Sequence, residues 1–331
     1  MKRLPGFALC MSLAALAAYC VAGSHFNPIP ANGVFSAAVA SAQDQAPPPD
    51  QGPDPAAVNQ APDTTGQGAS GQSYTTEAPP PADQNPDDAN YAEQPTATAT
   101  EAPPPLPDYA QPPAPGDGYV WTPGYWAWGP YGYYWVPGVW VEPPYVGGLW
   151  TPGYWGFYGG RYLFYPGHWG FHIGWYGGIN YGFGYVGFGY EGGYWNSGHF
   201  FYNRVYNNIN ERAVRNVYSY RANVRVNNNF RENNVRANNN VRMNNNVRPS
   251  YRGGPAGVQS NPRPSEGAAY REPTAPRMNT QVQHEQNYGA VRGQYATENH
   301  GKPAMTSESR PLRADSNVKP QQRSGGGEHH R

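Results

Sequence analysis

Trp121-Thr-Pro-Gly-Tyr-Trp126 is the first of four copies of a six-residue pattern in which aromatic residues flank a central Pro-Gly pair. The other three copies are Trp135-Val-Pro-Gly-Val-Trp140, Trp150-Thr-Pro-Gly-Tyr-Trp155 and Phe164-Tyr-Pro-Gly-His-Trp169. Successive copies start 14, 15 and 14 residues apart, and a looser fifth copy without the proline is Trp195-Asn-Ser-Gly-His-Phe200. All ten tryptophans lie between Trp121 and Trp195. Because an internal repeat defines the unit from which a fold is built, these copies mark where the chain is ordered.

The residues around the copies alternate aromatic and small side chains with a period of two, which is the pattern of β-strands. Trp126-Ala-Trp128 and Tyr133-Tyr-Trp135 flank the turn-forming stretch from Gly129 to Gly132. The same plan recurs where Gly159-Gly160 separates residues 154–157 from residues 162–165. Aromatic residues favour strands and pair well across them, so each of these stretches predicts a hairpin.

The Pro-Gly pair of each copy interrupts the alternation. Proline cannot donate to a central ladder, so we interpret the pair as a type II turn or a bulge. The sequence therefore predicts a small all-β domain over residues 119–202. This domain is a meander of short antiparallel aromatic-rich hairpins, one per repeat, flanked by long disordered segments. Several hairpins must pack together, because a single one is marginally stable in water.

Composition limits the ordered part of the chain to this one domain. The 331 residues include 41 Gly and 37 Pro, and the mean hydropathy is −0.77. Only residues 119–202 carry enough apolar surface to offset the entropy of ordering. The net charge of zero conceals a segregation, because residues 43–118 hold 12 acidic and no basic residues, whereas residues 204–331 hold 20 basic and 9 acidic ones. We interpret the two charged parts as solvated tails.

The first residues have the pattern of an export signal. Two basic residues precede an apolar stretch from Leu4 to Gly23. We predict a signal peptide over residues 1–42, cleaved after residue 42, the last residue of Ala40-Ser-Ala42, or after residue 23. An uncleaved membrane anchor is a further alternative, because the apolar stretch is about long enough to span a membrane.

The two cysteines, Cys10 and Cys20, both lie in this predicted signal. Cys20 loosely fits a lipoprotein box, but the bulky Tyr19 before it argues against lipidation. Cleavage at either site would leave a mature chain with no disulfide and no thiolate chemistry.

Residues 43–118 are predicted to be an acidic, proline-rich, disordered linker. Pro-Pro-Pro runs at 47–49, 79–81 and 103–105 favour hydrated polyproline II structure. A spacer that projects the aromatic domain is the favoured interpretation, and a polyproline ligand for a partner is the alternative.

The basic C-terminal part has a repeat of its own. Residues 203–250 form an Asn/Arg-rich region with copies of Val-Arg-x-Asn-Asn-Asn, which we predict to be disordered or irregular because asparagine disfavours helix and strand interiors. Residues 251–331 are predicted to be a polar, mostly disordered tail. Within this tail, residues 279–299 predict a helix with a thin apolar stripe, formed by Val282, Tyr288, Val291 and Tyr295.

The Trp-x-Pro-Gly-x-Trp copies resemble those of the bacterial exported proteins described as WXXGXW or YXWGXW repeat proteins. Three further segments are similar to the same proteins, residues 174–184, 198–204 and 299–303. The resemblance spans Tyr119 to about Pro303 with gaps, and the acidic linker lies outside it. It implies a place in the bacterial envelope and no known catalysis, and it adds no site residue.

The sequence suggests no catalytic, cofactor-binding or metal-binding set, and we predict that the protein is not an enzyme. Glu142 and Glu191 are the only carboxylates of the aromatic segment, and no feature of the sequence brings them together as a glycosidase pair would require. His168, His172 and His199 lack carboxylate or thiolate partners in sequence, so we expect them to pack or hydrogen-bond locally rather than bind a metal.

The tryptophans are the candidate ligand-binding residues. Indole rings have an apolar face and a polar N–H group, a combination suited to stacking on sugar rings. The alternative is that the rings form the core of a domain with almost no Leu or Ile. Strand periodicity permits both an inward core and an outward patch. The candidate platform consists of Trp121, Trp126, Trp135, Trp140, Trp150, Trp155 and Trp169.

We therefore expect a non-enzymatic exported protein of the periplasm, the outer membrane surface or the medium. It would bind or organise a polysaccharide or peptidoglycan through aromatic side chains. The alternative is a self-associating structural protein of the envelope or extracellular matrix. Export argues against nucleic acid as the partner of the basic tail, and a membrane would be reached only through an uncleaved signal or a lipid anchor.

Overall fold

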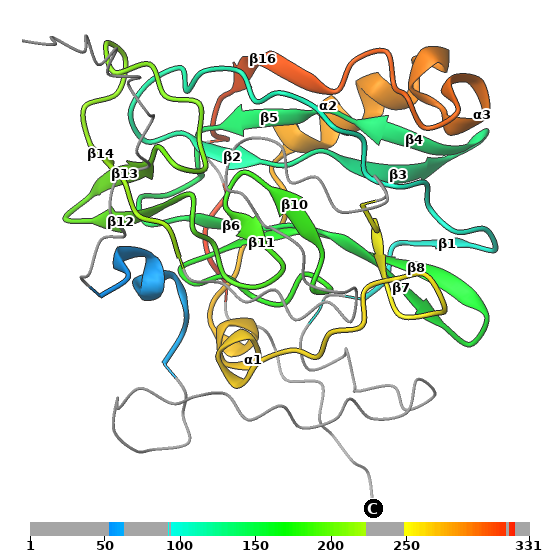
Figure 1. Ribbon diagram of the computed structural model, residues 1–331, viewed down its shortest axis with the longest axis horizontal. Coiled ribbons are helices and arrows are strands. Elements are labelled where there is room, and N and C mark those ends of the chain that lie inside the picture. The colour runs from blue at the N-terminus through cyan, green and yellow to red at the C-terminus, as the bar shows by residue number, and fades with distance from the viewer. Residues whose placement is uncertain (1–52, 63–91, 93, 223–247, 316–317, 322–331) are drawn as a thin grey trace, which may run out of the picture. The chain divides into compact units, whose positions relative to one another are not determined.

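Two long antiparallel hairpins dominate the computed structural model, which describes residues 53–62, 92, 94–222, 248–315 and 318–321 (Figure 1). The predicted signal peptide, more than half of the predicted linker and the Val-Arg copies between residues 223 and 247 lie outside the described residues. Short strands in small, mainly antiparallel sheets make up most of the regular structure, and helices are few. The predicted all-β class is confirmed.

The first hairpin is built from repeat copies one and two. Its outgoing arm consists of β2 (Val120–Thr122) and β3 (Tyr125–Gly129), and its returning arm of β4 (Gly132–Val136) and β5 (Gly138–Val141). One register runs through the whole hairpin, because Trp121 faces Trp140 and Trp126 faces Trp135.

The second hairpin repeats this plan with copies three and four. Its arms are β6 (Leu149–Thr151) with β7 (Tyr154–Tyr158), and β8 (Arg161–Tyr165) with β9 (His168–Gly170). Trp150 faces Trp169, and Trp155 faces Phe164. The predicted strands on both sides of Gly129–Gly132 and of Gly159-Gly160 are confirmed.

The Pro-Gly pairs lie in the middle of the hairpins, where each ladder is interrupted. Pro123-Gly124 lies opposite Pro137-Gly138, with two residues on each arm and an unchanged register. The prediction of a type II turn or bulge is therefore wrong: the glycines at 124, 138, 153 and 167 lack the positive φ of a type II turn, and equal arms leave no bulge. One hairpin per repeat is also wrong, since each hairpin needs two copies.

Hydrogen bonds tie the two hairpins to each other. The hydroxyl of Tyr185 donates to the carbonyl oxygens of Trp121 and Trp150, at 3.2 and 2.9 Å. The indole N–H of Trp155 donates to the carbonyl oxygen of Trp126 at 2.7 Å. These buried bonds satisfy polar groups that would otherwise cost free energy.

Strands from both flanks extend the hairpin sheets. β1 (Ala97–Ala99) pairs antiparallel with β8, β15 (Tyr251–Arg252) pairs parallel with β7, and β16 (Ser307–Leu312) pairs parallel with β5. The resulting orders are β1-β8-β7-β15 and β16-β5-β2. The predictions of a disordered linker and a mostly disordered tail are thus wrong for residues 94–118 and for much of 248–315. Those segments cover strand edges and faces that the hairpins alone would leave open.

The looser fifth copy has a different structure from the other four. It forms the hairpin of β12 (Gly193–Asn196) and β13 (His199–Asn203), with Trp195 facing Phe200 across it. Ser197 and Gly198 both have positive φ, as in a two-residue type I′ turn. In the four true copies the two aromatic residues follow one another along an arm, whereas here they face each other.

The remaining strands form small sheets beside the hairpins. β14 (Val217–Tyr218) pairs parallel with β13, and β10 (Asn180–Gly182) pairs antiparallel with β11 (Tyr185–Val186). The first described part of the Asn/Arg-rich region, residues 203–222, therefore includes a strand.

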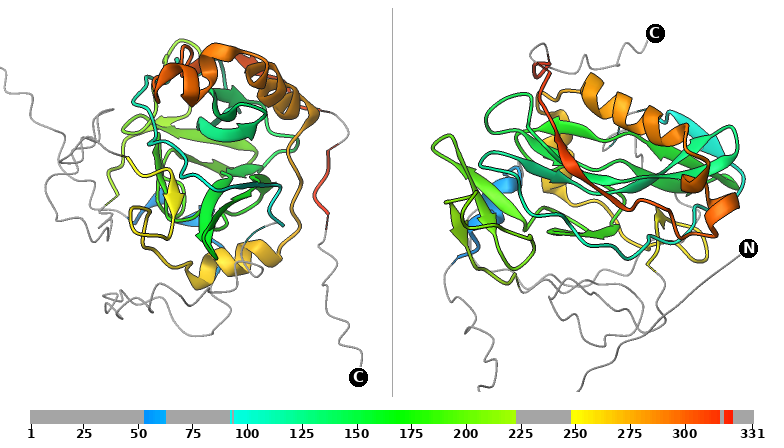
Figure 2. Two further views of the ribbon diagram at one scale, coloured as in Figure 1. Left: turned by 90° about the vertical axis from the view of Figure 1, so that its right-hand side faces the viewer. Right: turned by 90° about the horizontal axis from the view of Figure 1, so that it is seen from above.

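Helices lie on two sides of the strands (Figures 1 and 2). They are η1 (Pro55–Asn59), α1 (Pro264–Arg271), α2 (Asn279–Gly289), η3 (Arg292–Gln294) and α3 (Ala296–Asn299). Figure 2 shows α2 lying along the first hairpin, where it contacts β3 and β4. The predicted helix over 279–299 is confirmed in its first part and breaks at Ala290. Its predicted stripe is confirmed only in part, because Tyr295 is buried and Val282 and Tyr288 are partly buried, whereas Val291 is exposed and the buried residues of α2 itself are Gln281 and His284.

The core is aromatic, as the scarcity of Leu and Ile requires. Eight of the ten tryptophans are buried, and Trp195 is half-buried against the core. Facing tryptophans meet mostly edge to face, with centroids 5.4 Å apart for Trp121 and Trp140 and 5.3 Å apart for Trp126 and Trp135. Such geometry adds about 0.5–1.5 kcal/mol per pair beyond burial.

Candidate functional site

The repeat pattern has a physical explanation in the paired arms. The first aromatic residue of each copy packs on the glycine of the facing copy. A Cβ atom at Gly138 would lie 2.6 Å from Trp121, and one at Gly167 would lie 2.5 Å from Trp150. Trp135 covers Gly124 and Phe164 covers Gly153 in the same way. The aromatic ring and the glycine therefore recur together because each ring needs a residue without a side chain on the other arm.

This packing removes the predicted tryptophan platform. Each of its seven residues is at most 5 % exposed, so their faces touch neighbouring rings and glycines instead of solvent. The interpretation of the tryptophans as core is correct for all seven. The seven buried residues are Trp121, Trp126, Trp135, Trp140, Trp150, Trp155 and Trp169.

Exposed rings occur at the turn of the first hairpin instead. Trp128 is 36 % exposed and packs edge to face on Tyr133. Tyr131 is 54 % exposed, contacts Tyr295 and carries the Arg292 guanidinium 4.1 Å from its ring centroid. We call Trp128, Tyr131, Arg292 and Thr297 the tip cluster. Thr297 joins it through a 3.4 Å hydrogen bond to the Tyr131 carbonyl oxygen.

A second feature of the hairpins is that they hold part of the predicted linker. Residues 101–116, which we call the strap, run across them. Two indole N–H groups of the repeat donate to strap carbonyls, Trp126 to Pro105 at 3.1 Å and Trp140 to Pro112 at 2.8 Å. Hydroxyl groups do the same along its length, with Tyr133 donating to Glu101, Ser250 to Pro103, Ser307 to Ala110 and Tyr202 to Gly116.

The strap has the side-chain period of a polyproline II helix. Pro103 and Leu106 are buried and Tyr109 is partly buried against the core, at spacings of three residues. Gln111 and Ala114, also three apart, are buried further along. Three residues per turn and carbonyls free of internal hydrogen bonds define polyproline II structure. The hairpins and neighbouring segments therefore bind the strap by its carbonyls and by side chains at every third position, with one break in the period between Tyr109 and Gln111.

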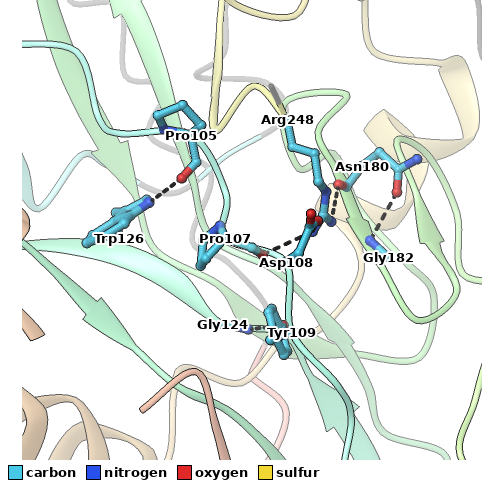
Figure 3. A network of polar contacts seen from close by, with 9 residues as sticks. All are labelled: Pro105, Pro107, Asp108, Tyr109, Gly124, Trp126, Asn180, Gly182 and Arg248. Atoms are coloured by element: carbon cyan, nitrogen blue, oxygen red, sulfur yellow. Dashed lines mark hydrogen bonds and ion pairs between the residues drawn. The ribbon is translucent and has the colours of Figure 1, made fainter. Parts of the chain in front are cut away.

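Arg248 fixes the strap from the other side (Figure 3). Its guanidinium donates to the carbonyl oxygens of Pro107 at 3.2 Å and Asn180 at 3.1 Å, and lies 3.6 Å from the Asp108 carboxylate. Its own carbonyl accepts from the N–H of Leu106 at 2.9 Å. Burial lowers the pKa of Arg248, and these oxygens compensate its charge. Arg248, the arginine of the last Val-Arg pair in the Asn/Arg-rich region, is thus a structural anchor.

Tyr109 links the strap to a Pro-Gly interruption. Its hydroxyl accepts a 2.9 Å hydrogen bond from the N–H of Gly124, a group that the broken ladder leaves unpaired. Burial raises the pKa of Tyr109 to about 12. On the second hairpin Tyr181 donates to the carbonyl oxygen of Gly153 at 2.7 Å. Tyrosine hydroxyls therefore provide hydrogen-bond partners for backbone groups that have none across the interrupted ladders.

Two buried glutamates have perturbed acidity. Burial, helped by the nearby Asp54 carboxylate, raises the pKa of Glu191 to about 8. Burial alone raises the pKa of Glu266 to about 8, although its Oε2 atom accepts from the N–H of Arg263 at 2.7 Å. Glu191 Oε2 and Glu266 Oε1 are both buried without a hydrogen-bond partner.

The carboxylates and histidines considered from the sequence are dispersed. Glu142 accepts from Ala314 N at 3.4 Å, whereas Glu191 is buried beside Asp54, so the two do not share partners. His172 contacts Glu272 at 2.7 Å, His168 is buried, and His199 is exposed. Across the described ranges no group of three or more His, Cys, Asp or Glu residues is placed to hold a metal ion. The helices of that same part of the chain are too short or too polar to cross a membrane.

The strap was not predicted from the sequence, where a polyproline ligand for a partner was the alternative to a spacer. A usable signal was present, because Pro103, Leu106 and Tyr109 repeat an apolar residue every third position. That period fits neither helix nor strand and matches polyproline II. Arg248 and Ser250 carried no comparable signal.

Comparison with known proteins identifies the repeat. A search of curated proteins and a search of solved structures give no match. The family model described as WXXGXW repeat (2 copies) matches residues 116–141. These residues contain copies one and two, the two arms of the first hairpin. The resemblance noted from the sequence is confirmed, and this chain carries the WXXGXW repeat, of which two copies make one hairpin.

Proposed function

We propose that this chain is a non-enzymatic exported protein of the bacterial envelope or surface that binds or helps organise a polymer such as a polysaccharide or peptidoglycan. The apolar N-terminal stretch and the absence of cysteine beyond Cys20 support export. The observation that carries polymer binding is the exposure of Trp128 and Tyr131 at the turn of a hairpin whose other aromatic residues are mostly buried.

The tip cluster offers the two kinds of contact that a sugar chain needs. Exposed rings of Trp128 and Tyr131 provide flat apolar faces. Arg292 and Glu298, which lie 3.5 Å apart and are both largely exposed, provide charged hydrogen-bonding groups beside them. The rings lie on a rigid support, because β3 and β4 pair up to Gly129 and Gly132 at the turn. A preformed platform of this kind loses little entropy on binding.

The experiment is a pull-down of the full chain with insoluble peptidoglycan and with immobilised polysaccharides. The test variant is Trp128→Ala with Tyr131→Ala, which removes the exposed rings and leaves the indole pairs of the core intact. Phe171→Ala is the matched control, because Phe171 is also an exposed aromatic residue, at 44 %, but lies after β9 on the second hairpin. We expect roughly tenfold weaker binding for the double variant, equivalent to about 1.4 kcal/mol, and unchanged binding for the control. Equal retention of all three proteins would refute the role of the tip cluster.

Self-association is the second candidate. Open strand edges give it little support, since β1 has only three residues and β16 carries Pro311, Glu308 and Arg310, which are features that protect edges. The observation that favours it is the strap, a proline-rich segment of this chain bound by aromatic side chains of the same chain.

A further inference from the structure

The contacts between strap and hairpins are those of a receptor with a peptide ligand. Domains that recognise proline-rich peptides use aromatic-lined surfaces and exploit the low entropy of preformed polyproline II. Here the strap carbonyls of Pro105 and Pro112 accept from the indoles of Trp126 and Trp140. The strap side chain of Tyr109 packs on Trp135, with centroids 5.8 Å apart.

We propose that this face of the paired hairpins is a binding site for an extended proline-rich strand, and that a second copy of this protein can supply the strand in place of the tethered residues 101–116. The proposal rests on the second candidate function, self-association, and gives it a structural route. It is independent of polymer binding by the tip cluster, which lies outside these contacts.

The face of the paired hairpins that binds the strap, which we call the receptor, contacts features that are the same in every copy of the strap. Most of the hydrogen bonds go to backbone carbonyls, and the apolar contacts need only a side chain at every third position. Charge adds selectivity for this sequence, because the Asp108 carboxylate of the strap lies 3.6 Å from the Arg248 guanidinium. This pair of an acidic strap residue and a basic partner suits a second copy, whose strap carries the same carboxylate.

The junction between strap and hairpin can act as a hinge. Gly116 and Gly118 flank Asp117, and no atom lies within 4 Å of a Cβ placed at either glycine. Gly118 has a φ of +83°, a conformation that glycine adopts readily. A change at this junction would swing the strap away without breaking the β2–β5 pair, and β1, which directly precedes the strap, would leave β8 with it. Exchange of such an element between identical chains is a common route to dimers.

The tethered strap has the advantage at low concentration. A short tether gives a bound segment an effective concentration in the millimolar range. A free second copy therefore competes only when the protein is concentrated, or when its own receptor is impaired. If the receptor is impaired in one copy and the strap is impaired in the other, binding between the two copies becomes detectable.

The test is complementation between two full-length variants. Copy one carries Trp126→Phe and Trp140→Phe, which keep the rings but remove both indole donors, and we expect each change to weaken strap binding about fivefold. Copy two carries Leu106→Asp, which places a charge in the buried part of the strap. Native mass spectrometry of ¹⁴N and ¹⁵N forms identifies which copies associate.

We expect a one-to-one heterodimer in the mixture, because the intact strap of copy one binds the intact receptor of copy two. Each variant alone should stay monomeric at the same concentration. If copy two does not fold alone, its folded circular dichroism signal should return when copy one is added. The proposal is overturned if neither a heterodimer nor a recovered signal appears up to about 1 mM, the effective concentration of a short tether. Polymer pull-down, which uses the untouched tip cluster, separates this failure from failure of the first proposed function.

Discussion

The indole ring of Trp121 packs directly on the backbone of Gly138, across the interrupted ladder of the first hairpin. A Cβ atom at Gly138 would lie 2.6 Å from Trp121 Cζ2 and 2.9 Å from the backbone nitrogen of Gly124. The facing pair, Trp135 on Gly124, repeats the relationship with the arms exchanged. Each hairpin is thus closed by two reciprocal ring-on-glycine contacts.

Replacing Gly138 by alanine should therefore destabilise the protein. The added methyl group cannot fit without displacing Trp121 or the facing backbone, and such overpacking costs about 1–3 kcal/mol. Thermal unfolding followed by circular dichroism measures the change. Gly116→Ala is the matched control, because that Cβ meets no atom within 4 Å and the φ of Gly116 is not positive. An equal melting temperature for the two variants would contradict the role of the ring contact.

Local structure was largely predictable from these residues because strand periodicity is a short-range property. The alternation around Trp126 and Trp135 specifies the β3–β4 hairpin, and Gly159-Gly160 specifies the next turn. The way in which copies combine was not predicted, because a Pro-Gly pair is equally compatible with a turn and with an interrupted ladder. The choice between a turn and an interrupted ladder depends on the facing arm, which is 14 residues away in sequence.

The flanking segments were harder to predict for a different reason. Residues 101–116 have the composition of a hydrated spacer, and composition does not record that Trp126 and Trp140 have indole N–H groups in need of acceptors. Buried donors seek partners wherever the chain provides them. The prediction of a tryptophan platform was wrong for the same reason, which is that the contacts of a side chain depend on distant parts of the chain. Strand periodicity does not show which face of Trp126 packs on another ring.

Tryptophan accessibility provides a direct test of the core. Eight tryptophans are at most 5 % exposed, Trp195 is half-buried, and Trp128 is the most exposed. Acrylamide should therefore quench only a small fraction of the fluorescence, and Trp128→Phe should remove most of that fraction. Trp175→Phe is the control, since loss of a buried indole should leave the quenchable signal unchanged. Extensive quenching in the Trp128→Phe chain would mean that the indoles of the repeat are open to solvent.

The fifth copy allows a stabilising change. Ser197 and Gly198 form the two-residue turn between β12 and β13, with φ values of 51° and 81°. Asn-Gly is the preferred sequence of a type I′ turn because asparagine tolerates positive φ better than serine does. Ser197→Asn should raise the stability by a few tenths of a kcal/mol, up to about 1 kcal/mol, and Ser197→Val should lower it. Chemical unfolding midpoints check the order Asn, Ser, Val, and a reversed order would rule out this turn type.

Stability should fall as the pH rises through neutrality, and Glu266 should account for part of the loss. Its ordinary pKa of 4.5 is raised to about 8 by burial, so between these values the native state binds a proton that the unfolded chain has lost. The stabilisation is complete below about pH 4.5 and is lost as the pH rises toward 8, at up to about 1.4 kcal/mol per pH unit.

In Glu266→Gln the amide oxygen can still accept from Arg263 N, but the charge cannot form. The variant should therefore be more stable than the wild type at pH 8, with a difference that shrinks on acidification. Glu211→Gln, at an exposed carboxylate, should follow the wild-type pH profile. A Glu266→Gln profile parallel to that of the wild type would show that Glu266 is already ionised in the native state.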